Sequence, residues 1–226
     1  MTTLLTGASG FIGGVLLREL LDRGRRVRAL VHESTGELEE LGVECVHGDI
    51  RDLDSLGPAM EGIDTVFHLA SLISLAGNLG GRVTDTNVLG AQNMARAALA
   101  ASVSRFVHFS SIHAFDLTDT SICVDEDSPR VGSSHPIYDR TKWEGEQRVR
   151  AVVAEGLDAV IVHPVGVMGP FDQAPSRIGQ VLLDLEAQRL PLFIPGGLEV
   201  ALHVGLHRGA CTCLQCGLRP GLHSLR

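Results

Sequence analysis

Tyrosine and lysine each occur once in the chain, as Tyr138 and Lys142, four positions apart. In a helix, residues at i and i+4 share one face, so the ammonium is expected about one turn from the phenol. A nearby cation favours the phenolate and lowers the pKa of the phenol. Such a phenol can pass a proton to or from a substrate oxygen. The alternative is a helix start with a half-buried aromatic ring and a lysine whose ammonium reaches solvent.

A glycine-rich turn near the start of the chain is a second candidate for chemistry. Gly7, Gly10 and Gly13 have the spacing G-x-x-G-x-x-G, between a short apolar segment and an amphipathic one. Glycines let the backbone turn sharply and approach a pyrophosphate, and the helix N-terminus behind them offers N–H groups and partial positive charge. A strand before the turn and a helix after it are the context that a dinucleotide-binding motif requires. The alternative is a tight turn that binds nothing.

The residue after the second strand bears on the choice between NAD and NADP. An acidic residue there bonds the ribose 2′-hydroxyl of NAD, whereas a basic residue suits the 2′-phosphate of NADP. The expected strand at 26–31 ends at His32, and Glu33 follows. Because His32 is nearest to the strand end, the sequence favours NADP, with NAD as the alternative.

The elements that must position these residues alternate along the chain. Apolar runs predict strands at 3–6, 26–31, 43–47, 63–69, 105–110 and 158–163. Helical spacing predicts helices at 11–22, 36–41, 53–60, 87–101 and 138–155. This order predicts an α/β fold with a Rossmann-type, doubly wound parallel sheet. A long polar loop at 112–135 is expected to be functional, because compact domains seldom carry idle loops of that length.

Composition narrows the classes of partner. The net charge of −8 argues against a nucleic-acid partner or a membrane-surface partner, since both usually require a basic face. The sequence shows no charged-then-apolar leader and no apolar run long enough to cross a bilayer. We therefore expect a cytoplasmic protein that acts on a small-molecule substrate.

Taken together, the motifs resemble those of the extended short-chain dehydrogenase/reductase family, most closely its dihydroflavonol reductase-like and sugar-nucleotide epimerase branches. Six signatures come in the family's order, at Thr6–Gly13, Gly48–Asp52, Phe67–Ser71, Asn87–Gly90, Ser110–Ser111 and Tyr138–Lys142. A seventh, His163–Pro170, has histidine where the family has arginine. The similarity covers roughly residues 3–197.

The resemblance implies where a nicotinamide cofactor binds. The glycine turn would hold the pyrophosphate, Asp49 and Ile50 would contact the adenine, and Lys142 would bond the nicotinamide ribose. Together with His32, the predicted cofactor contacts are Gly7, Ser9, Gly10, Phe11, Ile12, Gly13, Asp49, Ile50, Leu69, Ala70, Ser71, Tyr138, Lys142, Pro164 and Val167. Of these, Pro164 and Val167 would flank the nicotinamide.

The resemblance also implies a reaction. Ser111 matches the family's catalytic hydroxyl, and with Tyr138 it would hold a substrate carbonyl or hydroxyl for hydride transfer. Turn chemistry is the alternative explanation for a serine pair at a strand end. The predicted function is therefore an NAD(P)-dependent oxidoreductase acting on a secondary alcohol or ketone, dihydroflavonol reductase-like. Two alternatives stay open, a nucleotide-sugar epimerase or dehydratase and a cofactor-binding protein without turnover.

The last part of the chain departs from the pattern. We expect a Rossmann domain at 1–197 and a divergent tail at 198–226 in place of the family's substrate region. Residues 200–226 contain no Asp or Glu, which favours a tail that comes from a shifted reading frame or a truncation. Cys211, Cys213 and Cys216 lack a matched second pair, so no metal site is predicted. A homodimer through the helices at 87–102 and 138–155 is a further prediction.

Overall fold

The computed structural model describes residues 1–32, 36–119, 123–172, 176–187 and 189. Six parallel strands form one sheet in the order β3-β2-β1-β4-β5-β6. The strands are β1 Thr2–Thr6, β2 Arg26–Val31, β3 Glu44–His47, β4 Thr65–His68, β5 Arg105–Phe109 and β6 Ala159–Val162. The helices are α1 Phe11–Asp22, α2 Gly36–Glu40, α3 Gly57–Met60, α4 Arg82–Thr84, α5 Gly90–Ala100, α6 Ile137–Ala154 and α7 Arg177–Glu186. The predicted Rossmann-type parallel sheet is confirmed.

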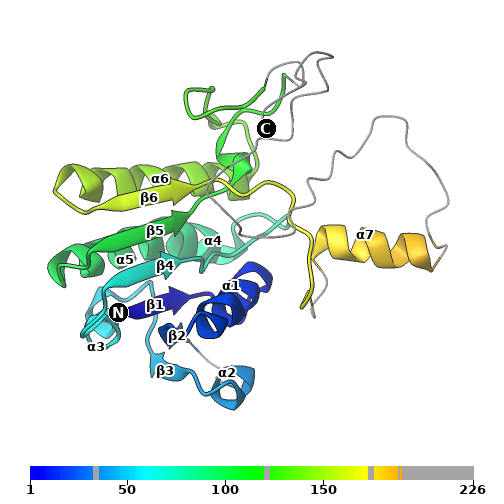
Figure 1. Ribbon diagram of the computed structural model, residues 1–226. Coiled ribbons are helices and arrows are strands. Elements are labelled where there is room, and N and C mark those ends of the chain that lie inside the picture. The colour runs from blue at the N-terminus through cyan, green and yellow to red at the C-terminus, as the bar shows by residue number, and fades with distance from the viewer. Residues whose placement is uncertain (33–35, 120–122, 173–175, 188, 190–226) are drawn as a thin grey trace, which may run out of the picture.

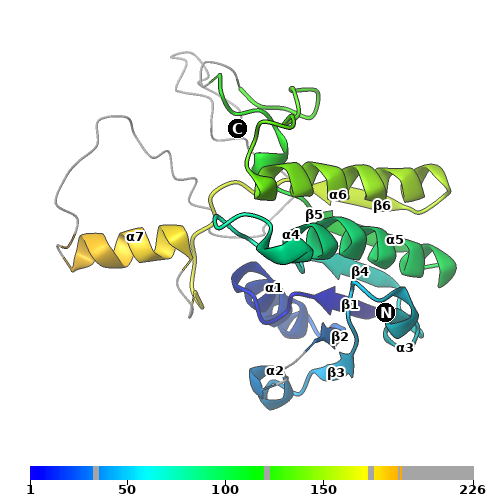
Figure 2. The same cartoon turned by 180° about the vertical axis from the view of Figure 1, so that it is seen from behind.

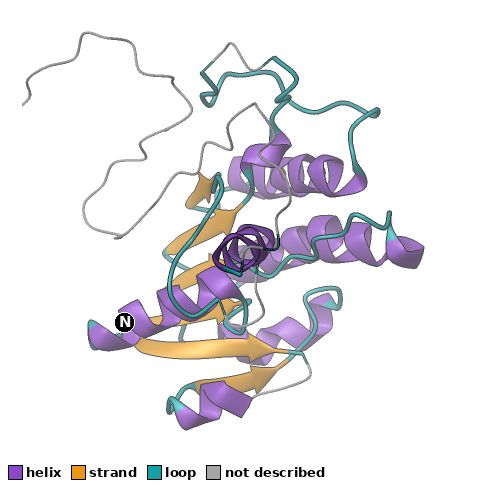
Figure 3. Cartoon of the chain, turned by 90° about the vertical axis from the view of Figure 1, so that its right-hand side faces the viewer, coloured by secondary structure: helices purple, strands orange, loops and turns teal. Residues whose placement is uncertain are grey.

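Helices pack on both faces of the sheet, and a separate hydrophobic core fills each interface (Figure 3). Successive strand residues point to opposite faces, so Leu4 and Leu5 of β1, both fully buried, enter different cores. Leu4 lies in the core under α3, α5 and α6, whereas Leu5 lies in the core under α1 and α2. Figure 2 shows α5 and α6 side by side over the strands of one face. Each fully buried leucine contributes about 1.5–3 kcal/mol to folding.

The carboxyl ends of the strands meet at one edge of the sheet, towards which the arrowheads point in Figure 1. The glycine turn follows β1, Leu69–Ser71 follow β4, Ser110–Ser111 follow β5, and His163–Pro164 follow β6. In open parallel sheets this edge is where ligands bind. The topology therefore brings motifs that are far apart in sequence to a common edge.

Two helical segments differ from the expectation. The helix predicted to start at residue 87 follows directly on α4 and a π-helical turn at Asp85–Leu89, so helical backbone begins at Arg82. Gly80 and Gly81 precede it with positive φ, and the Asn78 side chain accepts a hydrogen bond from Thr84 N at 3.0 Å. The helix predicted at 53–60 divides into a 3₁₀ turn at Leu53–Leu56 followed by α3.

The C-terminal part adds one element that the sequence analysis did not predict. The helix α7 follows the loop after β6 and projects away from the sheet in Figure 1. The predicted tail at 198–226, including Cys211, Cys213 and Cys216, lies outside the described residues. None of the helices in the described ranges is long and apolar enough to cross a membrane.

Candidate active site

The glycine turn after β1 leaves no room for side chains. Gly7 has φ +72°, and a Cβ there would come within 2.9 Å of Ala70 N. A Cβ on Gly13 would overlap the Gly7 carbonyl oxygen. Gly10 is the N-cap of α1 and forms no side-chain cap bond, and Ser9 beside it is exposed. The turn is thus a backbone cradle in front of an uncapped helix N-terminus, which is a favourable place for a phosphate group.

The segments predicted to line the cofactor path lie against this cradle. Ala70 N donates a hydrogen bond to Thr6 Oγ1 at 3.1 Å, which fixes the end of β4 beside the end of β1. The backbone of Leu69 lies 3.0 Å from where a Gly7 Cβ would be. Ser71 is exposed. Phe11 and Ile12 open α1 and are half-buried.

At the ends of β2 and β3, three side chains form a cluster. Arg51 Nη2 donates to Asp49 Oδ2 at 2.6 Å and lies 3.4 Å from His32 Nε2, and His32 Nε2 lies 3.3 Å from Asp49 Oδ2. The hydrogen bond from Arg51 lowers the pKa of Asp49 to about 2. The sequence analysis missed Arg51, although its place two residues after Asp49 was a usable signal. Ile50 points elsewhere, since its side chain is buried in the core and its carbonyl accepts from Asn93 Nδ2 at 2.9 Å.

Ser111, Tyr138 and Lys142 come together where β5 meets α6. The Ser111 side chain lies near the Tyr138 phenol and lowers its pKa. Ser111 also caps the short 3₁₀ turn at Ile112–Ala114, with its Oγ accepting from His113 N at 3.2 Å. Lys142 is 5% exposed, and its Nζ donates to the Phe109 carbonyl at 2.8 Å.

The expected lowering of the Tyr138 pKa is wrong for this structure. Burial raises the pKa of Tyr138 above its ordinary value, the hydrogen bond with Ser111 opposes the rise, and the charge of Asp139 adds to it. The Lys142 ammonium is bonded to the Phe109 carbonyl instead of the phenol. Burial lowers the pKa of Lys142 to about 8, although the nearby Glu146 carboxylate raises it. The phenol therefore stays protonated at neutral pH.

A hydrogen-bonded chain holds the first turn of α6 in place. Asn87, in the π-helical turn, accepts from Leu72 N at 2.7 Å and donates through Nδ2 to Thr141 Oγ1 at 3.1 Å. Thr141 Oγ1 donates to the Tyr138 carbonyl at 2.9 Å. A Cβ on Gly145 would overlap the Asn87 carbonyl oxygen, so these helices approach closely. The backbone that carries Tyr138 is thereby fixed to the loop after β4.

The loop after β6 closes the same edge. The Pro164 carbonyl accepts from Ile112 N at 3.0 Å, and a Cβ on Gly169 would lie 3.7 Å from the Phe11 ring. Val167, half-buried, lies between these two contacts in sequence.

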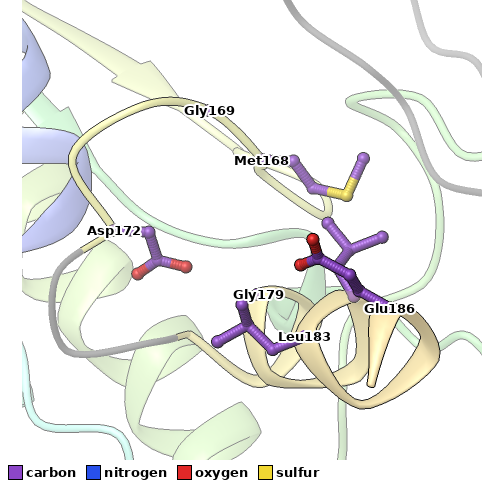
Figure 4. Close-up of a pocket in the computed structure, with 7 residues that line it drawn as sticks. Met168, Gly169, Asp172, Gly179, Leu183 and Glu186 are labelled. Carbon is purple, nitrogen blue, oxygen red and sulfur yellow. The ribbon is translucent and has the colours of Figure 1, made fainter. Parts of the chain in front are cut away.

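A pocket of about 230 Å³ opens between this loop and α7 (Figure 4). It is lined by Met168, Gly169, Asp172, Gly179, Leu182, Leu183 and Glu186.

Within the described part of the chain, no group of three or more His, Cys, Asp or Glu side chains could hold a metal ion.

The buried carboxylate Glu146, one turn after Lys142, is a further charged group at this edge that the sequence analysis missed. Its i+4 spacing from Lys142 was the available signal.

Comparison with known proteins identifies the relatives of this chain. The family described as NAD dependent epimerase/dehydratase matches residues 3–200. Sterol demethylase protein B of Methylococcus capsulatus is 35% identical over 201 residues, which cover 88% of this chain and 61% of that protein. A putative dihydroflavonol 4-reductase of Synechocystis is 34% identical over 200 residues, which cover 87% of this chain and 58% of the relative.

Solved structures agree with these sequence relatives. The crystal structure of gox2253 matches with a TM-score of 0.76 and 36% identity, over 84% of this chain and 59% of that one. The Thermus thermophilus UDP-glucose 4-epimerase complex with NAD matches with a TM-score of 0.70 and 25% identity, over 85% of this chain and 64% of that one. The chain thus spans about three-fifths of the length of the two sequence relatives named above.

Proposed function

The chain belongs to the NAD-dependent epimerase/dehydratase family, and from that premise we propose that it transfers a hydride between a nicotinamide cofactor and a secondary alcohol or ketone. The observation that carries the proposal is the convergence of Ser111, Tyr138 and the buried Lys142 at the edge where the glycine turn also lies. Two hydroxyls that can hold one substrate oxygen, with a fixed cation nearby, are suited to proton transfer.

The residues at this edge fit a dinucleotide. A Cβ on Gly7, Gly10 or Gly13 would fill the cradle that these glycines form. A cradle without side chains lets a pyrophosphate approach the backbone closely. We propose that Ser9, Phe11 and Ile12 contribute contacts from the same turn, and that Asp49 and the Ile50 backbone meet the adenine. The other proposed contacts come from Leu69, Ala70, Ser71, Tyr138, Lys142, Pro164 and Val167, within a domain proposed to span 1–197. When bound, the cofactor supplies or accepts the hydride.

The protein's own part of the reaction is proton transfer and orientation. In the direction of reduction, the Ser111 hydroxyl and the Tyr138 phenol hold the substrate oxygen, and Tyr138 gives its proton to that oxygen. A phenol with a raised pKa is protonated at neutral pH, which suits this donor role. The phenolate that remains is stabilised by the positive charge of Lys142. In the oxidation direction the same atoms move in reverse.

We propose NADP as the preferred cofactor. The support is the Arg51 guanidinium, 3.4 Å from His32 Nε2, because it adds a second basic group next to the position that selects between the two cofactors. The carboxylate of Asp49, bonded to Arg51, favours NAD instead. Fluorescence titrations of the chain with NADPH and with NADH measure the preference directly.

Two other functions remain as alternatives. A nucleotide-sugar epimerase would use the same Ser, Tyr and Lys, and a similar structure is a UDP-glucose 4-epimerase in complex with NAD. The second alternative is a cofactor-binding protein without turnover.

The homodimer through the helices at 87–102 and 138–155 also stays a prediction. Light scattering of the purified chain measures its oligomeric state.

The experiment is a cofactor titration followed by a substrate screen. The screen contains steroid ketones, dihydroflavonols and UDP-glucose, because the names of the relatives point to these classes. Oxidation of NADPH by a ketone supports the proposal, and interconversion of the UDP-sugar supports the epimerase. Binding of NADPH without turnover of any compound supports the third function and contradicts the proposal.

A further inference from the structure

Glu146 on α6 is a fully buried carboxylate, 0% exposed, with four side-chain partners. Its Oε2 accepts from Ser110 Oγ at 3.0 Å and lies 2.7 Å from His163 Nε2. Its Oε1 accepts from Arg150 Nη2 at 2.8 Å and lies 3.4 Å from Arg130 Nη2. Burial raises the pKa of this carboxyl, but the bond with His163 and the two guanidiniums outweigh it and hold the pKa at about 2. The carboxylate is therefore ionised at neutral pH.

These partners come from segments that carry the candidate active site. Ser110 directly follows β5 and stands before Ser111, and His163 directly follows β6 and stands before Pro164. The backbone joins the same two strand ends, since Ser110 N donates to Val162 O at 2.8 Å and Ile112 N donates to Pro164 O at 3.0 Å. One carboxylate thus holds both strand ends against α6.

Arg130 extends the cluster to the long loop at 112–135. Its guanidinium lies 3.7 Å from the centre of the Phe115 ring and 4.7 Å from that of Trp143 on α6. Its Nη1 is also 3.4 Å from Glu146 Oε2. The loop is consequently tied to α6 by stacking and by charge, close to the end of β5.

Lys142 and Glu146 hold consecutive residues at the end of β5. Lys142 Nζ donates to the Phe109 carbonyl at 2.8 Å, and Ser110 Oγ donates to the Glu146 carboxylate, one turn further along α6. Ser111 is the next residue. A shift at either contact would therefore move the Ser111 hydroxyl, which lies near the Tyr138 phenol.

We propose that Glu146 is a positioning residue, which fixes the ends of β5 and β6 against α6 and places its negative charge one helical turn from the buried Lys142. The importance of Glu146 for catalysis rests on the proposed function, but the tests of this inference use the free protein and need no substrate. Failure of the substrate screen and failure of this inference are therefore separate outcomes.

Two buried imidazoles near Lys142 do not offer a negative charge. His68 on β4 and His108 on β5 are buried, and burial lowers the pKa of His68 to about 3 and that of His108 well below its ordinary value. Both imidazoles are thus neutral at pH 7. Among the described residues, Glu146 is the group whose charge raises the pKa of Lys142, against the effect of burial.

The first test uses the fact that the chain has a single lysine. Protein grown with lysine labelled with ¹³C at Cε gives one side-chain signal, whose shift with pH yields the pKa of Lys142. In Glu146→Gln, proton binding by Lys142 is expected to weaken about tenfold. Glu146→Asp keeps the charge and should stay near the wild-type value. Arg150→Gln, the matched control, removes a half-exposed partner of the same carboxylate and should change the pKa little. An unchanged pKa in Glu146→Gln overturns the charge role.

The second test measures the positioning role by amide hydrogen exchange. Ser110→Ala removes one hydroxyl and no charge, so the variant is expected to fold even if Glu146→Gln does not. The amides of Ser110 and Ile112, which bond across to the end of β6, should exchange at least fivefold faster, while the amide of Leu4 in the centre of the sheet stays unchanged. Equal acceleration of all three would indicate a merely structural effect and overturn the positioning role, as would no acceleration of any of them.

Discussion

The turn after β1 and the ends of β5 and β6 face the same edge of the sheet, but they are built from different groups. The turn is made of backbone, where Gly7 and Gly13 leave no space for a Cβ and no side chain caps α1. The ends of β5 and β6 are surrounded by buried ionisable side chains, among them Lys142 and Glu146 of α6 and His108 of β5.

This difference determines which change disrupts each region. A backbone cradle requires positions without side chains, so an added methyl group disrupts the cradle. A change of pH has little effect on it. A cluster of buried ionisable groups depends on charge, so it responds to pH and to loss of a single partner. The expected separation is that the cradle governs cofactor binding, and the cluster governs proton transfer and acid stability.

The largest effect should follow from filling the cradle. In Gly13→Ala the new Cβ would overlap the Gly7 carbonyl, so the turn must move, at a cost of roughly 1–3 kcal/mol in unfolding free energy. NADPH affinity, measured by fluorescence titration, should fall at least 100-fold. Gly14→Ala is the control, because its Cβ would meet the flexible end of Arg18 at 3.3 Å and the Ala8 carbonyl oxygen at an ordinary contact distance of 3.5 Å. This variant should bind NADPH as the wild type does. Equal affinity in both variants would contradict a backbone cradle.

Acid should destabilise the protein through the buried ionisable groups near the ends of the strands. The folded-state pKa of His68 is about 3 and that of His108 lies well below its ordinary value, so below about pH 6.5 the unfolded chain binds protons that the folded chain does not. Stability therefore falls as pH falls, by about 1.4 kcal/mol per pH unit for each histidine once pH is well below 6.5. Urea unfolding at several pH values measures the slope.

The control for this slope is His108→Phe. His108 Nδ1 has no hydrogen-bond partner, and the ring stacks near Phe106, so phenylalanine can replace it. The variant should lose the part of the slope that His108 contributes, so its stability should fall less steeply with falling pH than that of the wild type. A slope equal to that of the wild type would mean that His108 is protonated in the folded state.

The smallest effect concerns cofactor choice. In Arg51→Gln, loss of the guanidinium should weaken NADPH binding about tenfold and change NADH binding less than twofold, because only NADPH carries the 2′-phosphate. Arg96→Gln, which removes an exposed ion pair with Glu155, is the matched control for loss of one positive charge. Equal weakening of both cofactors would place Arg51 away from the ribose.

The sequence was sufficient to predict the sheet and the glycine turn, because both have local patterns. Alternation of strands and helices predicts a parallel sheet, and the spacing of Gly7, Gly10 and Gly13 is itself the motif. Strand boundaries differ from the prediction by at most two residues at either end.

The contacts of the buried cluster could not be predicted in the same way. Which group the Lys142 ammonium meets depends on how α6 lies against the end of β5, and no local pattern specifies that packing. The sequence therefore paired Lys142 with Tyr138, whereas the structure pairs it with the Phe109 carbonyl. The convergence of Arg130, His163 and Ser110 on Glu146 joins residues up to 36 positions apart, for the same reason.

The central claim is that Tyr138 transfers the proton. It is tested most directly by the rate of NADPH oxidation with a ketone that the wild type reduces, compared with Tyr138→Phe at equal cofactor saturation. The variant should lose at least about 100-fold in kcat, with the Kd for NADPH unchanged within twofold. A Tyr138→Phe variant that turns over at the wild-type rate would contradict the account.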